Sequence, residues 1–569
     1  MEKFSEIAYE RPDVNQLVKR FKKSFKSLKN SKNFEDADKA YINMQNQFKF
    51  VETMFVTAKI RSDINVKDKF YEKEMRYLNS VLPRFMLLIN KIGKELINSP
   101  FKKDFENKYG LQMFRLIDAE LKTMNWKILL LLVKEANLGQ KYSKTVASAK
   151  TKFNNEESNF YNLLKYMEST DRNVRKDAFK AWADMYEGIS GKLDDIYEKS
   201  VNLRKKMAKR TGFKDYIEMS YIKRNRFDYS ISDVEKFRQS VKEYIVPQCE
   251  IIFNKRADIL GIDKIRYYDE FISFKEGNPV PKADKNEFLE LAQKMYSELS
   301  DETGEFFDFM RKYELFDLYT KTDKHMGGYC TFLSQYDAPF IFSNFNGTSA
   351  DIDVLTHEAG HAFEIYTAAK TQPITDYLSS TSEINEIHSM AMEHFTYPWM
   401  ELFFQDQADK YRYAHLSNAL CVIPYIVCVD EFQHKVYSNN NNYSSKEIRH
   451  IWRDLEKQYM PWRDYDGNSF LEEGGFWMQK QHIFLYPFYY LEYSLAQICA
   501  FELYSNMKKN RSSAWEDYYK LCKSGGSKGY FELLEIANLK NPLKPETVRK
   551  VVEEVTEELM LYEKGQDIN

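Results

Sequence analysis

The stretch Thr356-His357-Glu358-Ala359-Gly360-His361 has the pattern H-E-x-x-H. On a helix, residues four apart lie on one face, so His357 and His361 are able to bind one metal ion together. Glu358 then lies beside the ion, where its carboxylate can accept a proton from a bound water. With nine histidines in the chain, chance produces this pattern in on the order of one in a hundred such sequences. The pattern therefore predicts a catalytic zinc site on a helix.

The sequence before this motif indicates a small sheet that leads into the metal-binding helix. Two apolar segments, Gly327–Phe332 and Pro339–Phe345, are predicted to pair as a hairpin, with the proline of the second segment at an edge or a strand start. Asn346-Gly347 is a turn signal, and Asp351 or Asp353 could cap the helix that follows. An exposed edge strand here would hold an extended peptide through main-chain hydrogen bonds, although an ordinary core hairpin fits the pattern equally well.

A catalytic zinc needs a third protein ligand, and the sequence downstream offers several. Five residues of the next helical segment have suitable side chains: Glu383, Glu386, His388, Glu393 and His394. Glu386 and Glu393 are seven residues apart and share a helix face, so one could bind the metal while the other holds a histidine ligand in place. Side-chain chemistry alone leaves the choice among the five open.

The composition is that of a large globular protein with long helices. Its 569 residues exceed one ordinary domain, hydrophobic residues make up 43%, and only 14 prolines and 20 glycines interrupt the chain. The net charge of -2 gives no field of one sign, so nucleic acid is not an expected partner. The six cysteines form no C-x-x-C pair, no signal peptide is visible, and the most apolar run, residues 126–133, is too short to span a membrane. These features indicate reduced thiols, a cytoplasmic location and no membrane partner.

Helical periodicity runs through most of the chain outside the motif. From Val14 to about Ser148 the pattern predicts successive amphipathic helices. Asn residues between apolar ends make Phe153–Phe160 a short hairpin or loop. A later helix, capped by Asp233, is expected to run to about Leu260 with a kink at Pro247.

One weak interruption marks the predicted domain boundary. A helix capped by Asp171 is expected to run to Lys209, with a break at Gly188–Gly191. The break divides the chain into an N-terminal helical region, residues 1–190, and a region that carries the metal site, residues 191–569.

Three segments resemble the oligoendopeptidase F branch of the thimet-oligopeptidase-like zinc metallopeptidases. They are Asn344-Phe345-Asn346-Gly347-Thr348, His357-Glu358-Ala359-Gly360-His361-Ala362-Phe363 and Glu386-Ile387-His388-Ser389. In that family the third ligand is a glutamate on the next helix, 25 positions after the second histidine, and this count leads to Glu386. The resemblance implies that His357, His361 and Glu386 bind one Zn2+ ion per chain and that Glu358 is the general base.

A fourth segment is similar to the substrate-binding region of the same family. It comprises Glu473–Trp477, His482 and Pro487–Tyr493. The resemblance implies that His482, Tyr490 and Tyr493 stabilise the transition state through hydrogen bonds to the carbonyl oxygen, while Tyr489 competes with them as a substrate-binding residue. The thimet-oligopeptidase branch has a glycine-rich loop after this histidine, whereas residues 483–486 contain no glycine. An aromatic-rich core is the alternative interpretation of these tyrosines.

The resemblance implies a mainly helical, two-lobed, zincin-like metallopeptidase with a small hairpin beside the metal and a deep central cleft. Residues 1–190 would form part of the cleft wall and residues 191–569 the catalytic domain. The expected activity is endopeptidase hydrolysis of short unstructured oligopeptides by a zinc-activated water. A helical zinc metallocarboxypeptidase is the nearest alternative, and a catalytically silent peptide-binding protein is an alternative of another class.

Overall fold

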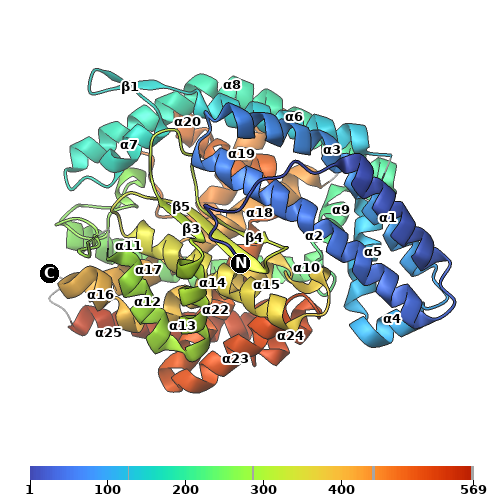
Figure 1. Ribbon diagram of the computed structural model, residues 1–569. Coiled ribbons are helices and arrows are strands. Elements are labelled where there is room, and N and C mark those ends of the chain that lie inside the picture. The colour runs from blue at the N-terminus through green and yellow to red at the C-terminus, as the bar shows by residue number, and fades with distance from the viewer. Residues whose placement is uncertain (126, 285–286, 439–442, 566–569) are drawn as a thin grey trace. The chain divides into compact units, whose positions relative to one another are not determined.

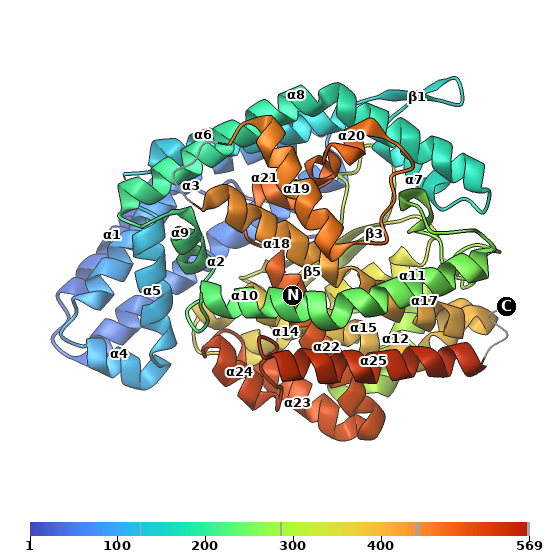
Figure 2. The same ribbon diagram turned by 180° about the vertical axis from the view of Figure 1, so that it is seen from behind.

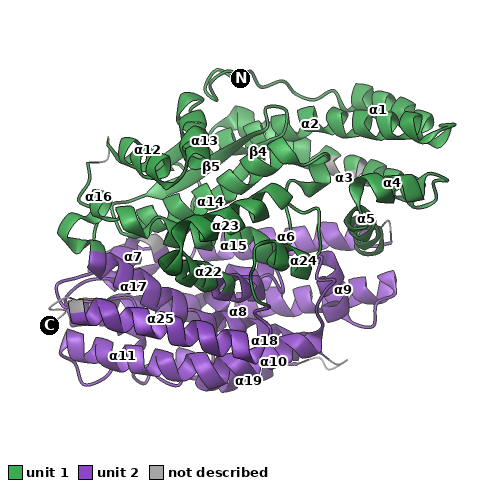
Figure 3. Cartoon of the chain, turned by 90° about the horizontal axis from the view of Figure 1, so that it is seen from below, with its two compact units in different colours: residues 1–125, 280–408, 499–540 green, residues 126–279, 409–498, 541–569 purple. Residues whose placement is uncertain are grey.

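The computed structural model describes residues 1–125, 127–284, 287–438 and 443–565 (Figure 1). Helices account for 70% of the residues and strands for 4%, so the predicted mainly helical fold is confirmed. The chain forms two compact units, each assembled from three separate segments (Figure 3). Unit 1 comprises residues 1–125, 280–408 and 499–540, and unit 2 comprises residues 126–279, 409–498 and 541–569. This interleaved division differs from the predicted division at residue 190.

Unit 1 contains helices and a three-stranded sheet. Its helices are α1 (Val14–Lys29), α2 (Phe34–Ile64), α3 (Lys69–Ile97), α4 (Lys102–Tyr109), α5 (Gln112–Thr123), α12 (Phe288–Leu299), α13 (Asp301–Lys312), α14 (Ala350–Thr371), α15 (Ser382–Phe395), α16 (Glu401–Phe404), α23 (Arg511–Ser524) and α24 (Tyr530–Ile536). The helix α22 (Leu491–Lys509) crosses from unit 2 into unit 1.

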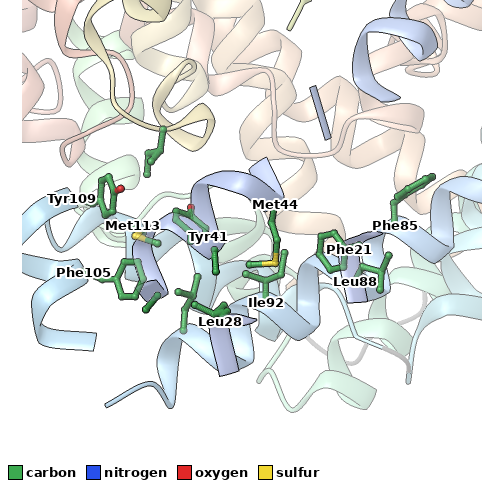
Figure 4. Packing of buried hydrophobic residues seen from close by; sticks show 14 of the residues in the cluster. Phe21, Leu28, Tyr41, Met44, Phe85, Leu88, Ile92, Phe105, Tyr109 and Met113 are labelled. Atoms are coloured by element: carbon green, nitrogen blue, oxygen red, sulfur yellow. The ribbon is translucent and has the colours of Figure 1, made fainter. Parts of the chain in front are cut away.

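A hydrophobic core joins α1 to α5 (Figure 4). On α1 the residues Val14, Phe21 and Leu28 recur every seven positions, so they share one face and are buried together. Burial of a leucine or phenylalanine side chain contributes roughly 1.5–3 kcal/mol. Tyr377, which follows α14, belongs to the same core, and its hydroxyl donates a hydrogen bond to the carbonyl of Tyr109 at 2.7 Å. The connection between α14 and α15 is thereby fixed against the N-terminal helices.

The sheet of unit 1 has the strand order β3-β5-β4. The predicted hairpin is confirmed, because β4 (Tyr329–Leu333) pairs antiparallel with β5 (Ala338–Phe345). The strand β3 (Phe316–Tyr319), which pairs parallel with β5, was not predicted. The central strand β5 is almost entirely buried, and Pro339 lies at its start, whereas β4 is an edge strand.

Unit 2 is built mainly from helices. They are α6 (Leu129–Ala147), α7 (Phe160–Met167), α8 (Arg172–Thr211), α9 (Tyr216–Lys223), α10 (Ile231–Ser240), α11 (Val246–Leu260), α17 (Ala408–Cys421), α18 (Ile423–Tyr437), α19 (Ser445–Tyr459), α20 (Ser469–Glu472), α21 (Gln481–Leu485) and α25 (Pro545–Gly565). The predicted hairpin near residue 155 is present as β1 (Thr151–Phe153) and β2 (Glu156–Ser158), with both asparagines of the turn at positive φ.

Three local predictions in unit 2 and at α14 need correction. The predicted break at Gly188–Gly191 is wrong, since α8 runs uninterrupted from its N-cap Asp171. A glycine in a helix costs only about 1 kcal/mol, and the burial of apolar side chains on one face of α8 stabilises the helix by more than two such costs. Ser230, not Asp233, caps α10, and Asp233 completes the capping box from the third helical position.

The cap predicted for α14 is also wrong. The N-cap position is Ser349. Asp351 instead accepts hydrogen bonds from the backbone N–H groups of Asn346, at 2.9 Å, and Gly347, at 2.7 Å. Its carboxylate therefore fixes the turn between β5 and α14.

One stretch, Glu401–Tyr437, has the length and apolar composition of a membrane span. In the structure 67% of that window is buried inside the protein, and the stretch is divided among α16, α17 and α18. This burial is typical of core helices.

Candidate metal centre

The metal-binding motif lies on α14, which contacts β4, β5, α15 and α23. His357 and His361 are one helical turn apart on the same face, as the sequence predicts. Their ring centroids are 5.0 Å apart, with an angle of 83° between the ring planes. Two imidazole edges therefore converge on one point beside α14.

Glu386 on α15 completes the group. Its Oε2 lies 3.3 Å from Nε2 of His357 and 3.5 Å from Nε2 of His361, and one ligand atom from each residue lies within 4.8 Å of the others. Nitrogen and oxygen ligands about 2.0–2.1 Å from a tetrahedral zinc ion are separated from one another by about 3.3 Å. The spacing and the His-His-Glu donor set therefore fit a zinc ion with its fourth position open.

Two hydrogen bonds hold these ligands in place. Oε1 of Glu393 lies 2.6 Å from Nδ1 of His357, which leaves Nε2 of that ring directed at the metal position. The hydroxyl of Ser389 donates to Oε2 of Glu386 at 3.0 Å. Burial disfavours the charge on Glu386, but the neighbouring imidazoles outweigh this effect and keep its pKa well below the ordinary value.

We expect Glu393→Ala to weaken zinc binding by about 10- to 100-fold, because the His357 ring loses the carboxylate that orients it. Glu393→Gln keeps an acceptor oxygen and removes the charge, so it should weaken binding less. Competition with a chromophoric chelator measures both affinities. Equal zinc affinities of the wild type and the alanine variant would contradict this role for Glu393.

Glu358 follows His357 on α14 and has 9% of its surface exposed. The backbone N–H of Cys330 on the edge strand β4 donates a hydrogen bond to its carboxylate. Burial raises the pKa of Glu358, although the two imidazoles and the Cys330 N–H act in the opposite direction. A carboxylate whose pKa is raised is a stronger base, and so a better proton acceptor, than an ordinary one.

Gly360, inside the motif, is required by the crossing of α14 and α15. A Cβ atom built on Gly360 would lie 2.5 Å from the carbonyl oxygen of His388 and 2.7 Å from Cα of Ser389. The two helices therefore touch through their backbones at the level of the metal ligands. This role is not predictable from the sequence alone, where the only signal is a glycine within a helical segment.

The other three residues considered as ligands lie elsewhere. Nδ1 of His388 is 3.4 Å from Sγ of Cys522, and burial lowers the pKa of His388 to about 3, so its imidazole is neutral. His394 packs among aromatic rings, including Tyr504 at 5.2 Å between centroids. Glu383 is fully buried. The structure thus brings Glu386, and none of these three, into the group with His357 and His361.

His482 and the predicted tyrosines form a separate cluster within unit 2. The ring of His482 is 5.0 Å from Tyr490, 5.8 Å from Tyr489 and 6.2 Å from Tyr493, measured between centroids. Tyr486, which is not among the residues predicted from the sequence, lies 6.1 Å from the same ring and is 55% exposed. Its position four residues after His482 on a helical turn was the available signal.

Buried ion pairs support the backbone of this cluster. Arg224 makes two hydrogen bonds to the buried Glu492, at 2.5 and 2.7 Å, and its guanidinium lies 4.5 Å from the centre of the Tyr489 ring. Phe488 has a φ of 63°, the left-handed region, and its carbonyl accepts a hydrogen bond from Arg226 at 2.5 Å. The sharp turn between α21 and α22 is thus made at a phenylalanine in the left-handed region, which glycine adopts more readily.

Family models match most of the chain. A model described as Peptidase M3 N-terminal domain matches residues 4–124, and a model described as Peptidase family M3 matches residues 165–553.

Similar proteins of known sequence include an oligoendopeptidase F homolog of Borreliella burgdorferi, 24% identical over 66% of this chain, and oligopeptidase PepF of Bacillus subtilis, 22% identical over 70%. The matches cover 63% and 59% of these two relatives' own lengths, which is less than two thirds. Among solved structures, PZ peptidase A with inhibitor 2 is 43% identical, with a TM-score of 0.93 and complete coverage of both chains. A candidate oligoendopeptidase F from Bacillus anthracis is 40% identical, with a TM-score of 0.89 and coverage of 99% of this chain and 98% of that one.

Proposed function

Because the chain belongs to peptidase family M3, we propose that it is a zinc-dependent endopeptidase that hydrolyses short, unstructured oligopeptides. The convergence of His357, His361 and Glu386 on one point, with Glu358 beside them, is the observation that carries the proposal. Free cysteine thiols at all six positions support the further proposal that the enzyme acts in the cytoplasm.

Glu358 has the central role in the proposed reaction. A zinc ion held by the three ligands would activate a water molecule and polarise the scissile carbonyl. Glu358 accepts a proton from the attacking water as the water oxygen forms a bond to the carbonyl carbon. Glu358 then passes this proton to the nitrogen of the leaving amine, and the amide C–N bond breaks. The Cys330 N–H holds the carboxylate in position, and Glu393 holds His357.

For the second cluster we propose the role that the family resemblance implies. His482, Tyr490 and Tyr493 would donate hydrogen bonds to the oxygen on which negative charge develops, and Tyr489 would contact the substrate. Their mutual ring contacts supply three donors in one small region, which supports the proposal. The edge strand β4 would hold the peptide main chain, since its Cys330 already contacts Glu358.

Peptides blocked at both ends test the proposed activity. We expect internal cleavage detected by mass spectrometry, loss of cleavage after chelation, and recovery when one equivalent of zinc is added back. Removal of terminal residues from unblocked peptides alone would favour a metallocarboxypeptidase. Tight peptide binding without any hydrolysis by the zinc-loaded protein would identify a catalytically silent peptide-binding protein.

A further inference from the structure

Unit 2 contains a groove with a volume of about 1300 Å³ that the proposed peptidase activity does not use. Its walls are the C-terminal part of α8, the start of α9, one face of α10 and one face of α18 (Figure 2). All the lining residues belong to unit 2. The groove is large enough for an elongated small molecule.

The groove carries an excess of positive charge. Six lysines and one arginine line it, against three carboxylates. The lysines are Lys205, Lys206, Lys209, Lys214, Lys242 and Lys435, and the acids are Asp215, Glu235 and Glu431. Since the whole chain has a net charge of only -2, this local excess is a property of the groove and not of the composition.

Part of this charge is neutralised within the fold. Arg238 is buried and pairs with Asp430 at 2.5 Å, and Lys242 pairs with Glu431 at 3.2 Å. Asp215 is occupied as the N-cap of α9, where it accepts a hydrogen bond from the Glu218 N–H at 2.9 Å. These groups already have partners within the protein, so their charges contribute little to the binding of an anion.

Three lysines retain uncompensated charge. Lys206, Lys209 and Lys214 are exposed and form no ion pair with any acid in the described parts of the chain. Lys206 and Lys209 are neighbours on one face of α8, where like charges repel each other. Burial lowers the pKa of the adjacent Lys205, so its ammonium group is already partly removed from water. An anion bound between these side chains would reduce the repulsion between Lys206 and Lys209 and would compensate the lost hydration of Lys205.

The chemistry of the cations selects the kind of anion. The planar fork of arginine recognises carboxylates and phosphates alike, and the one arginine of the groove is committed to Asp430. Among lysines the charge of the anion decides the preference, and a phosphate group carries about 1.5–2 negative charges at pH 7, against one on a carboxylate. The available cations are all lysines, which bind phosphate groups as point charges. We propose that the groove binds a short oligophosphate, either free inorganic triphosphate or the phosphate chain of a nucleotide. An acidic peptide is the competing ligand that the test must exclude.

Isothermal titration of the zinc-loaded protein with inorganic triphosphate, ATP, adenosine and an end-blocked tetraglutamate tests the proposal. We expect triphosphate and ATP to bind, adenosine and tetraglutamate to bind far more weakly, and the affinity to fall as the salt concentration rises. Similar affinities for triphosphate and ATP would show that the groove recognises the phosphate chain alone. A clear preference for ATP would show that it also recognises the nucleoside and that the ligand is a nucleotide.

A charge-matched pair of variants locates the binding. The triple variant Lys206→Gln, Lys209→Gln, Lys214→Gln should bind triphosphate at least about tenfold more weakly than the wild type. The control variant Lys19→Gln, Lys22→Gln, Lys23→Gln removes the same charge from exposed positions of α1 and should bind normally. Hydrolysis of a blocked peptide without added phosphate should be unchanged in both variants, so this test is independent of the peptidase proposal.

Equal triphosphate affinity in the two triple variants would place the anion elsewhere, for example on the zinc, and would overturn the proposal. The absence of triphosphate binding to the wild type, or tighter binding of tetraglutamate than of triphosphate, would overturn it as well.

Discussion

Glu358→Gln is expected to lower kcat for a blocked peptide by about 10²- to 10⁴-fold while the protein keeps its zinc. The amide has nearly the shape of the carboxylate, and its oxygen can still accept the hydrogen bond from the Cys330 N–H. It cannot accept a proton from the attacking water. Because Glu358 is not among the three ligands, the zinc content should remain at one ion per chain.

Glu364→Gln, on the same helix, is the matched control. Glu364 is buried, and burial raises its pKa well above the ordinary value, which favours the neutral form of its carboxyl group. Its replacement by the isosteric amide should leave kcat within a few-fold of the wild type. Undiminished hydrolysis by the Glu358→Gln variant would remove Glu358 from the mechanism.

Gly360→Ala is expected to abolish zinc binding and activity, and to destabilise the protein strongly. The added methyl group would overlap backbone atoms of His388 and Ser389 on α15, which cannot rotate away as a side chain can. The helices must separate, and Glu386, on the same helix, moves away from the two histidines. Zinc content by plasma mass spectrometry and the midpoint of thermal unfolding measure the two effects.

Gly188→Ala in α8 supplies the comparison for this substitution. A Cβ atom at Gly188 would meet nothing within 4 Å, so the alanine should stabilise the helix by roughly 0.5–1 kcal/mol. A Gly360→Ala variant with a normal unfolding midpoint and a full complement of zinc would show that the crossing of α14 and α15 is not essential.

Periodicity and turn chemistry predicted the local elements around the metal centre correctly. The H-E-x-x-H helix and the β4–β5 hairpin depend on residues that are close in sequence, and both are present. The choice of Glu386 depended on family resemblance, because its helical position alone did not separate it from Glu393 on the same face. The structure brings Glu386 into one group with His357 and His361, and gives Glu393 a different contact, with His357.

Apart from the two helix caps, the missed features depend on contacts between distant segments. The role of Gly360 exists only because α15 crosses α14 there, and the strand β3 is defined by its pairing with β5. The continuity of α8 through two glycines depends on its buried face, which outweighs the cost of each glycine. The division into two units could not be predicted either, because the segments of each unit are far apart in the sequence.

The late position of α23 has a consequence for the order of events during synthesis. α23 packs against α14, and the hydroxyl of Tyr518 donates a hydrogen bond to the carbonyl of His388, at the point where α14 and α15 cross. A nascent chain that ends before Tyr518 lacks this support, although the proposed metal ligands were synthesised well over a hundred residues earlier. Unit 1 is completed only by residues 499–540, so we expect the candidate metal centre to mature only after these residues have been synthesised. Growing chains that lack residues 499–540 would thus lack the proposed hydrolytic activity until unit 1 is complete.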